Sequence, residues 1–166
     1  MAFGRFFEEF ERGAVYRHWP GKTVTEYDHQ LFCLLTMVRH PIHLDAHHSK
    51  TATRHQERLV IGSYIFSLLI GLSEDDITGK ALSHLGFGKV EHCAPVLHGD
   101  TLYAESEVVE CHDHQSAQDR GMVTVETRGR NQHGALVMAF QRELVVARHT
   151  YSGHKIGPLT DTATGN

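Results

Sequence analysis

The feature of this sequence that most restricts its fold is an apolar run from Leu59 to Leu72, which reads LVIGSYIFSLLIGL. The run is shorter than the ~20 residues that a helix needs to cross a bilayer, so it predicts a buried helix and no membrane span. Because apolar side chains occur on all of its sides, such a helix must be enclosed by protein, and a sheet wrapped around it is the usual enclosure.

The chain after Ser83 has the pattern of an antiparallel sheet. Apolar and polar residues alternate with period two along Val123–Arg128, and Asn131–Gly134 is a short glycine-containing link suited to a hairpin. The predicted strands are Lys89–Val96, Thr101–Glu110, Met122–Arg130 and Ala135–Ala147. Helices followed by such a meander predict an α+β fold, in which about five strands curl around one long apolar helix.

A second helix is predicted from Glu26 to Leu35. Thr25, followed three residues later by Asp28, resembles a capping box in which aspartate replaces the usual glutamate. Three leucines recur at helical spacing and predict one face that packs inward. They are Leu31, Leu34 and Leu35.

Prolines predict the breaks around this helix. Pro20-Gly21 indicates a turn before it, and Arg39-His40-Pro41 indicates the start of a loop, since proline removes a backbone donor and restricts the preceding residue. We expect one domain over residues 1–149 and a polar, frayed tail over 150–166.

The charge of the chain argues against a nucleic-acid partner. The net charge is −4, and the basic residues are scattered rather than gathered on one segment. The amino terminus lacks an uninterrupted apolar run, so it predicts neither a signal peptide nor a membrane anchor, and we expect a cytoplasmic protein. Three widely spaced cysteines without a C-x-x-C pair predict free thiols.

Fifteen histidines raise the question of a metal site. His43, Asp45 and His47 would share one face of a strand, but a site needs a further ligand and an ordered second shell. Spacing alone is not specific, so we predict no bound metal.

Three segments resemble the MaoC-like hydratases. Leu35–Asp45, LTMVRHPIHLD, resembles the loop that the family writes S/T-G-D-x-N-P-[LIV]-H-x-D. Leu59–Gly62 resembles the start of the family's central helix, and Ala94–Leu102, APVLHGDTL, resembles its P-V-x-x-G-D-T-L strand turn. They occur in the family's order and cover about residues 5 to 148. The resemblance implies a hot-dog fold and (R)-specific hydration of a 2-enoyl-CoA, or the reverse dehydration of a 3-hydroxyacyl-CoA, without a cofactor.

The resemblance also implies which residues act. Hydration needs a base for water, an acid for the α-carbon, and donors for the enolate-like oxygen. His43 occupies the family's histidine position, and the backbone amides of Ile61 and Gly62 would bind the thioester oxygen. A residue without a side chain, such as Gly62, lets a carbonyl approach a helix amino end.

The motif departs from the family at two positions. Val38 stands at the aspartate and His40 at the asparagine. Valine cannot accept a proton, and an acid–base group typically contributes ~10²- to 10⁴-fold. Three explanations stay open: His40 works with His43 as the catalytic pair, Asp45 or Asp28 supplies the carboxylate, or the site binds an acyl thioester without hydrating it.

Further residues are candidates for substrate binding. Val38 would line the pocket, and the phosphates of coenzyme A would attract arginines near its mouth, namely Arg39, Arg54 and Arg58. A thioesterase is an alternative, but that chemistry commonly uses a carboxylate on the central helix, and the apolar run contains none. A non-catalytic acyl-CoA-binding subunit is another. The resemblance implies a homodimer, or a multimer of dimers, joined at sheet edges.

Overall fold

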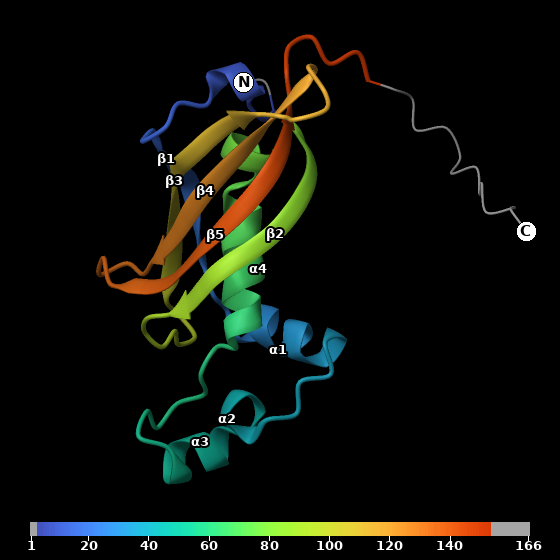
Figure 1. The fold of residues 1–166 in the computed structure, drawn as a ribbon. Helices are drawn as coiled ribbons and strands as arrows, with labels where there is room; N and C mark the ends of the chain where they lie inside the picture. The colour runs from blue at the N-terminus through green and yellow to red at the C-terminus, as the bar shows by residue number, and fades with distance from the viewer. Residues whose placement is uncertain (1–2, 154–166) are drawn as a thin grey trace, which may run out of the picture.

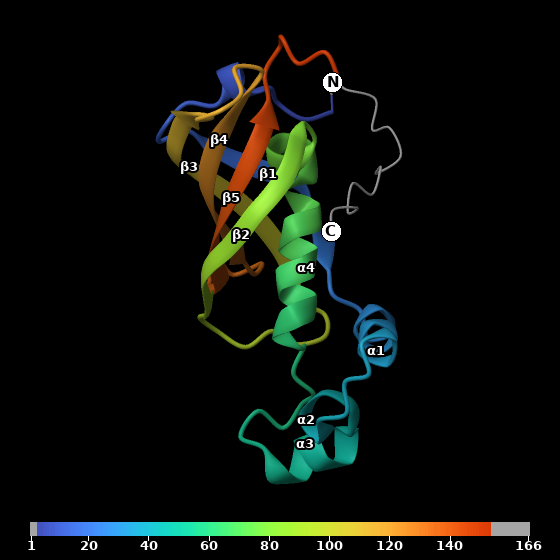
Figure 2. The same cartoon turned by 45° about the vertical axis from the view of Figure 1, so that its right-hand side comes forward.

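A five-stranded antiparallel sheet curls around one side of the central helix α4, Gly62–Leu72 (Figures 1 and 2). The computed structural model describes residues 3–153. The strand order is β1-β3-β4-β5-β2, and neighbouring strands are antiparallel. The bounds are β1 Val15–Thr23, β2 Ala81–His92, β3 Thr101–Asp113, β4 Arg120–Arg130 and β5 Leu136–Ala147. The predicted α+β fold is confirmed.

Three smaller helices gather at the end of the molecule where α4 begins (Figure 1). They are α1 Glu26–Leu35, α2 Pro41–Leu44 and α3 Ala46–Ala52. A short 3-10 turn, η1 Phe7–Glu9, precedes β1, and a π-helical turn, η2 Glu74–Thr78, follows α4. The predicted boundary at residue 149 stays a prediction, and most of the expected tail, residues 154–166, lies outside the described residues.

The core between α4 and the sheet is apolar near the start of the helix. Ile65 and Leu69 are buried there against residues of β3 and β5, including Leu102 and Phe140. Gly129 of β4 lies directly against α4, since an added Cβ there would lie 2.6 Å from Leu69 Cδ1. A larger residue at 129 would therefore force the Leu69 side chain to shift.

A buried polar layer separates this core from a second apolar cluster at the other end of the sheet. Arg142 lies in the layer, and its Nη2 donates to Ser73 Oγ at 2.7 Å and to Thr127 Oγ1 at 3.1 Å. Ser106 Oγ lies 2.9 Å from Thr127 Oγ1 and 2.9 Å from His18 Nε2. Burial lowers the pKa of Arg142 to about 10, so it remains a cation at neutral pH.

The central helix is shorter and more open than its sequence predicts. It begins at Gly62 rather than Leu59, because the preceding residues are extended: the Val60 N–H donates to Val96 O at 2.9 Å and Leu59 pairs with Leu97. The side that carries Ser63, Ser67 and Gly71 is exposed in the single chain, so the sheet encloses only part of the helix.

The first strand was not predicted from the sequence. Pro20-Gly21, interpreted as a turn, lies inside β1, which tolerates proline because it is an edge strand and its register is irregular between His18 and Lys22. The strand predicted at Lys89–Val96 is also wrong at both ends, since β2 runs from Ala81 to His92. The other three predicted strands match β3, β4 and β5 within a few residues at their ends.

The bounds of α1 and its capping box are confirmed. Thr25 Oγ1 accepts the Asp28 N–H at 3.1 Å, and Asp28 Oδ2 accepts the Thr25 N–H at 3.3 Å. The predicted inward face is wrong, because Leu34 and Leu35 are 73% and 75% exposed. The face that packs inward carries His29 and Cys33 instead, since it meets the polar backbone at the start of α4.

His29 attaches α1 to the start of α4. Its Nε2 accepts the Ile61 N–H at 3.1 Å, so its Nδ1 carries the proton and donates to His98 Nε2 at 2.8 Å. Burial, followed by the positive charges that His98, His43 and Arg58 can carry, lowers the pKa of His29 from 6.5 to about 4. The imidazole is therefore neutral at physiological pH and acts as a hydrogen-bond acceptor.

The predicted loop after Arg39 is wrong in part. His40 is extended, as a residue before proline should be, but Pro41 then begins α2, where its missing N–H is not needed. His40 Nδ1 accepts the Ile42 N–H at 3.3 Å as the cap of this helix. Since α2 and α3 are helices, His43 and His47 do not share a strand face.

The depressed pKa of His29 predicts a loss of stability in acid. Between pH 6.5 and about 4 the unfolded chain binds a proton at His29 that the folded chain does not bind. The contribution of His29 to the free energy of unfolding is therefore fully present above pH 6.5 and falls as the pH drops toward 4. The shift corresponds to roughly 3 kcal/mol at most. His29→Gln keeps an acceptor for the Ile61 N–H but does not titrate.

Urea unfolding of the parent and of His29→Gln at pH 7 and pH 5 measures this contribution. The parent should lose more stability than the variant between the two values. The burial-lowered pKa values of His18 and His84 affect both proteins alike and cancel in the comparison, whereas His98 is bonded to His29, so the difference reports the His29–His98 pair. An identical pH dependence would show that His29 is not held neutral by the fold.

Candidate active site

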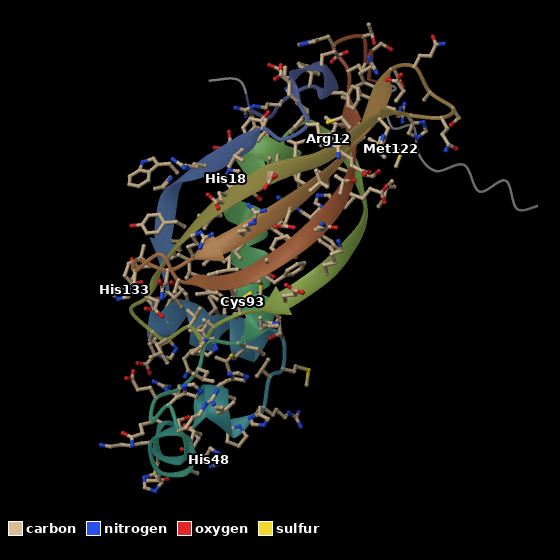
Figure 3. All side chains as sticks on the ribbon, turned by 60° about the vertical axis from the view of Figure 1, so that its left-hand side comes forward. Arg12, His18, His48, Cys93, Met122 and His133 are labelled. Atoms are coloured by element: carbon tan, nitrogen blue, oxygen red, sulfur yellow. The ribbon has the colours of Figure 1, made fainter. Side chains whose placement is uncertain are left out.

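A cavity of about 330 Å³ opens where α4 begins. His43 of α2 lines one side, and His92 and Cys93 at the end of β2 line another. Ile65 of α4 and Val96, in the connection between β2 and β3, add apolar surface. Figure 3 shows Cys93 at this end of the sheet, near the start of the central helix, whereas His48 lies farther out on α3. Segments far apart in sequence thus meet at one helix end.

His43 has a defined orientation in this cavity. Its Nδ1 lies 2.8 Å from the carbonyl oxygen of Leu59, which can only accept, so Nδ1 carries the proton. In the neutral ring the lone pair is then on Nε2. Among the described residues, Nε2 has no hydrogen-bond partner, and it is free to accept a proton from a small molecule in the cavity.

The backbone amides of Ile61 and Gly62, both predicted to bind substrate, differ in whether they already have a hydrogen-bond acceptor. The Ile61 N–H is engaged with His29. The Gly62 N–H, the first amide of α4, has no acceptor within the helix or elsewhere among residues 3–153. It also lies at the positive end of the helix dipole, which favours a developing negative charge. Gly62 and Ile61 do not line the cavity themselves, but they lie in sequence between Val60 and Ile65, which do, and Gly62 offers a free donor at the helix start.

His92 was missed in the sequence, and its ring contacts Gly62. A Cβ built on Gly62 would lie 1.9 Å from His92 Cε1, 2.7 Å from Nδ1 and 2.8 Å from Nε2. His92 pairs with Met138, a fully buried residue, and cross-strand partners point to the same face of a sheet. The alternation of β2 would have revealed this inward direction had the bounds of the strand been known.

The altered positions of the motif lie away from the cavity lining. Val38 is half-buried, and its N–H donates to Cys33 O at 2.9 Å after Met37, whose φ of 58° is left-handed. Arg39 and His40 are exposed, and the rings of His40 and His43 are 5.9 Å apart between centroids. None of the three residues 38, 39 and 40 lines the cavity.

The two carboxylates that might replace the missing aspartate are engaged elsewhere. Asp28 Oδ2 lies 2.6 Å from Lys22 Nζ, and this hydrogen bond, with those from Thr25, lowers the pKa of Asp28. Asp45 Oδ1 accepts the His48 N–H at 2.9 Å as the cap of α3, which lowers the pKa of Asp45. Both side chains stabilise helix starts.

One of the three candidate arginines reaches the cavity. Arg54 lines it, and its Nε donates to His55 Nε2 at 3.1 Å. Arg58 instead forms an ion pair with Glu26. Arg54 is thus the cation best placed to meet a phosphate at the cavity mouth.

No group of three or more His, Cys, Asp or Glu side chains within residues 3–153 is arranged to hold an ion. In the same range no helix is both long and apolar enough to span a bilayer. Cys33, Cys93 and Cys111 are free thiols.

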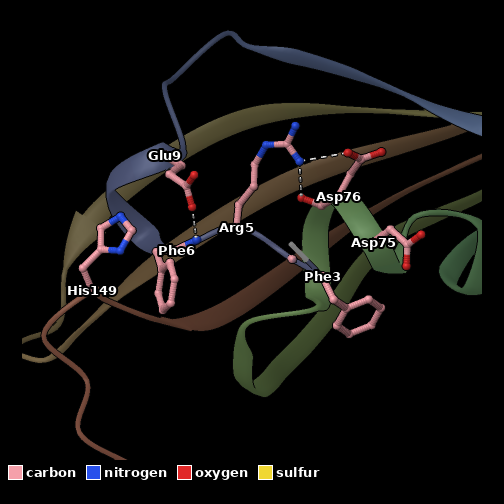
Figure 4. Close-up of a pocket in the computed structure, with 8 residues that line it drawn as sticks. Phe3, Arg5, Phe6, Glu9, Asp75, Asp76 and His149 are labelled. Carbon is pink, nitrogen blue, oxygen red and sulfur yellow. Dashed lines mark hydrogen bonds and ion pairs between the residues drawn. The ribbon is translucent and has the colours of Figure 1, made fainter. Parts of the chain in front are cut away.

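A second cavity, of about 520 Å³, lies between the amino-terminal segment and η2 (Figure 4). Three of its charged side chains are engaged: Arg5 Nη1 lies 2.8 Å from Asp76 Oδ1, and Glu9 Oε2 accepts the Phe6 N–H at 2.6 Å. None of the motif residues lines it. The cavity at the start of α4 is therefore the candidate active site.

Comparison with known proteins identifies the family of the chain. The family model described as mesaconyl-CoA hydratase matches residues 2–165. The mesaconyl-CoA hydratase of Cereibacter sphaeroides is 29% identical over 98% of this chain and 47% of its own length. The β-methylmalyl-CoA dehydratase of Chloroflexus aurantiacus is 29% identical over 87% of this chain and 41% of its own length.

A solved structure of an (R)-hydratase from Pseudomonas aeruginosa is 26% identical, with a TM-score of 0.71 over 93% of this chain and 95% of that one. The chain spans about half the length of the curated relatives that it matches. It has the hot-dog fold of the MaoC-like hydratases and dehydratases, and it belongs to the mesaconyl-CoA hydratase family.

Proposed function

We propose that this protein adds water to a 2-enoyl-CoA thioester, or removes it from a 3-hydroxyacyl-CoA, in the cavity at the start of α4. The supporting observation is that His43 and His92 line the same cavity, that His43 Nε2 has no hydrogen-bond partner among the described residues, and that His92 contacts Gly62, whose N–H also has no acceptor there. The names of the relatives, a mesaconyl-CoA hydratase and a β-methylmalyl-CoA dehydratase, support a CoA thioester of this kind.

The geometry suggests how hydration proceeds. The Gly62 N–H donates to the thioester carbonyl oxygen, where negative charge develops as water attacks C3. His43 Nε2 removes a proton from that water. The resulting imidazolium is stabilised because its Nδ1–H already donates to the Leu59 carbonyl. The Arg54 guanidinium, at the cavity wall, binds a phosphate of coenzyme A.

The three explanations for the valine at the family's aspartate position differ in their support. Asp28 and Asp45 hold helix starts, so they are poorly placed to supply the missing carboxylate. His40 is exposed, and one of its nitrogens caps α2. His43 is therefore the one proton-transfer group that the motif itself brings to the cavity. A subunit that binds an acyl-CoA without hydrating it remains the alternative from a different functional class.

A thioesterase is less well supported. The side chains of α4 include no carboxylate, and the acidic residues of η2 lie beyond the far end of the helix. A cytoplasmic location and the absence of a nucleic-acid partner stay predictions from the sequence.

We propose further that two copies of this chain join through β2. This strand is one edge of the sheet and exposes large apolar side chains, as does the outer face of α1. These residues are Leu85, Phe87 and Val90 of β2, and Leu31, Leu34 and Leu35 of α1. An uncovered apolar edge strand favours association, and a second copy in antiparallel register would cover it.

The dimer predicts a mass near twice 18.7 kDa by light scattering at micromolar concentration. Val90→Lys places a charge on the β2 edge and should shift the protein toward monomer. Val15→Lys, a matched change at an exposed position on the opposite edge strand β1, should leave the mass unchanged. A parent mass of 18.7 kDa, or dissociation by Val15→Lys alone, would contradict the β2 interface.

The proposed chemistry predicts a large effect at His43. His43→Ala should lower kcat for hydration by ~10²- to 10⁴-fold, because the base for water is removed. The melting temperature should change little, since the side chain is only half-buried. Loss of the conjugated enoyl-thioester absorbance, with crotonyl-CoA and mesaconyl-CoA as substrates, measures the rate.

His48→Ala is the control, because His48 lies on α3 outside the cavity. It should keep the parental rate. Full activity of His43→Ala on the best substrate would exclude His43 as the base, whereas unfolding of the variant would assign it a structural role.

A further inference from the structure

We propose that His92 is the second proton-transfer residue of this site and delivers the proton to C2 of the acyl group while His43 takes one from water. The inference rests on the proposed hydratase function and adds a residue that the family motif does not contain. It follows from the position of His92, from the freedom of its ring, and from the need for a second group.

The position of His92 is fixed by the sheet. It is the last residue of β2 and pairs with Met138, which is fully buried, so its side chain points toward α4. Its Cε1 lies 1.9 Å from where a Gly62 Cβ would be, and both ring nitrogens lie within 2.8 Å of that point. A carbonyl bound to the Gly62 N–H would therefore lie beside this ring.

The ring of His92 is also chemically free. Among the described residues it has no hydrogen-bond partner, and the side chain is exposed at the cavity wall. The other histidines near the site are hydrogen-bonded: His29 holds the Ile61 N–H and His98, His40 caps α2, and His55, which also lines the cavity, accepts from Arg54 Nε. His92 can therefore carry a proton to the substrate and recover it from solvent.

The reaction needs such a group because the motif supplies only one. Val38 replaces the family's aspartate, and Asp28 and Asp45 are held by Lys22 and by the start of α3. General acid–base catalysis of hydration requires a group that accepts a proton and a group that donates one. Within the described residues, His92 is the remaining histidine in contact with Gly62 that also lines the cavity.

The step balances with two histidines. Water oxygen bonds to C3 as His43 Nε2 takes its proton, and the C2=C3 π electrons move to give an enolate whose oxygen accepts the Gly62 N–H. The enolate then re-forms the thioester carbonyl while His92, acting as the imidazolium, gives a ring N–H proton to C2 and becomes the neutral imidazole. His43 afterwards loses its proton and His92 regains one through solvent, so the net change is the addition of one water.

Two variants separate proton transfer from packing. His92→Ala removes the ring, and His92→Gln keeps a polar side chain of similar size that cannot shuttle a proton. Both should lower kcat for enoyl-CoA hydration by ~10²-fold or more, with KM changed only a few-fold. Imidazole added to His92→Ala should restore part of kcat, because the vacated site is open to solvent. His112→Ala changes an exposed histidine that pairs with Glu110 and should keep parental rates.

The outcomes distinguish this inference from the function on which it rests. If His43→Ala is inactive while both His92 variants keep the parental kcat, the role of His92 is wrong and the hydratase proposal stands. A rise in KM without a fall in kcat, or a loss that imidazole does not restore, would make His92 a binding or packing residue and overturn the inference. If the parent hydrates neither crotonyl-CoA nor mesaconyl-CoA, the hydratase proposal itself fails, and the role of His92 fails with it.

Discussion

The hydrogen bond from the Ile61 N–H to His29 Nε2, 3.1 Å long, is the interaction on which the rest of the site depends. It joins two helices by satisfying the amide just before α4, so the next amide, that of Gly62, becomes the first free donor. The bond requires an unprotonated ring nitrogen, and burial supplies it by lowering the pKa of His29 to about 4. A cationic histidine there could not accept the amide and would oppose a positive helix end.

The same contact organises the histidines around it. The rings of His29 and His43 meet edge to face at 6.1 Å between centroids. His43 is held in turn by the Leu59 carbonyl, on the strand-like segment that leads into α4. The buried, neutral ring of His29 thus packs against the ring of His43, whose Nε2 is open to the cavity. Several of the fifteen histidines thus form hydrogen bonds around the start of α4.

A feature of the fold or of the site was predictable where residues that are neighbours in the sequence determine it. The capping box of Thr25 and Asp28, the period-two strands β3 to β5 and the apolar core of α4 are encoded by neighbouring residues, and their positions were predicted well. The strand β1 was missed because Pro20-Gly21 has the local pattern of a turn, and only its place at the sheet edge makes it tolerable.

The face of α1 and the role of His92 could not be predicted for a different reason. Leucines at helical spacing indicate an apolar face but not which partner covers it, and in this chain they point away from the core. His92 acquires its place only through its pairing with Met138 and its contact with Gly62, which are separated from it by tens of residues in sequence. The family motif indicated His43, which lines the cavity, and the roles of His43 and Gly62 stay predictions; the altered positions of the motif gave no sign of His92.

The central claim, that this site adds water to an enoyl thioester, is tested most directly by isotope incorporation. The protein is incubated with mesaconyl-CoA or crotonyl-CoA in water enriched in oxygen-18, and the acyl-CoA products are analysed by mass spectrometry. The account predicts a product heavier by one labelled water, with the label on C3 and none in the thioester oxygen. Recovery of free coenzyme A with the label in a released carboxylate would indicate a thioesterase, and unchanged substrate would contradict the hydratase account.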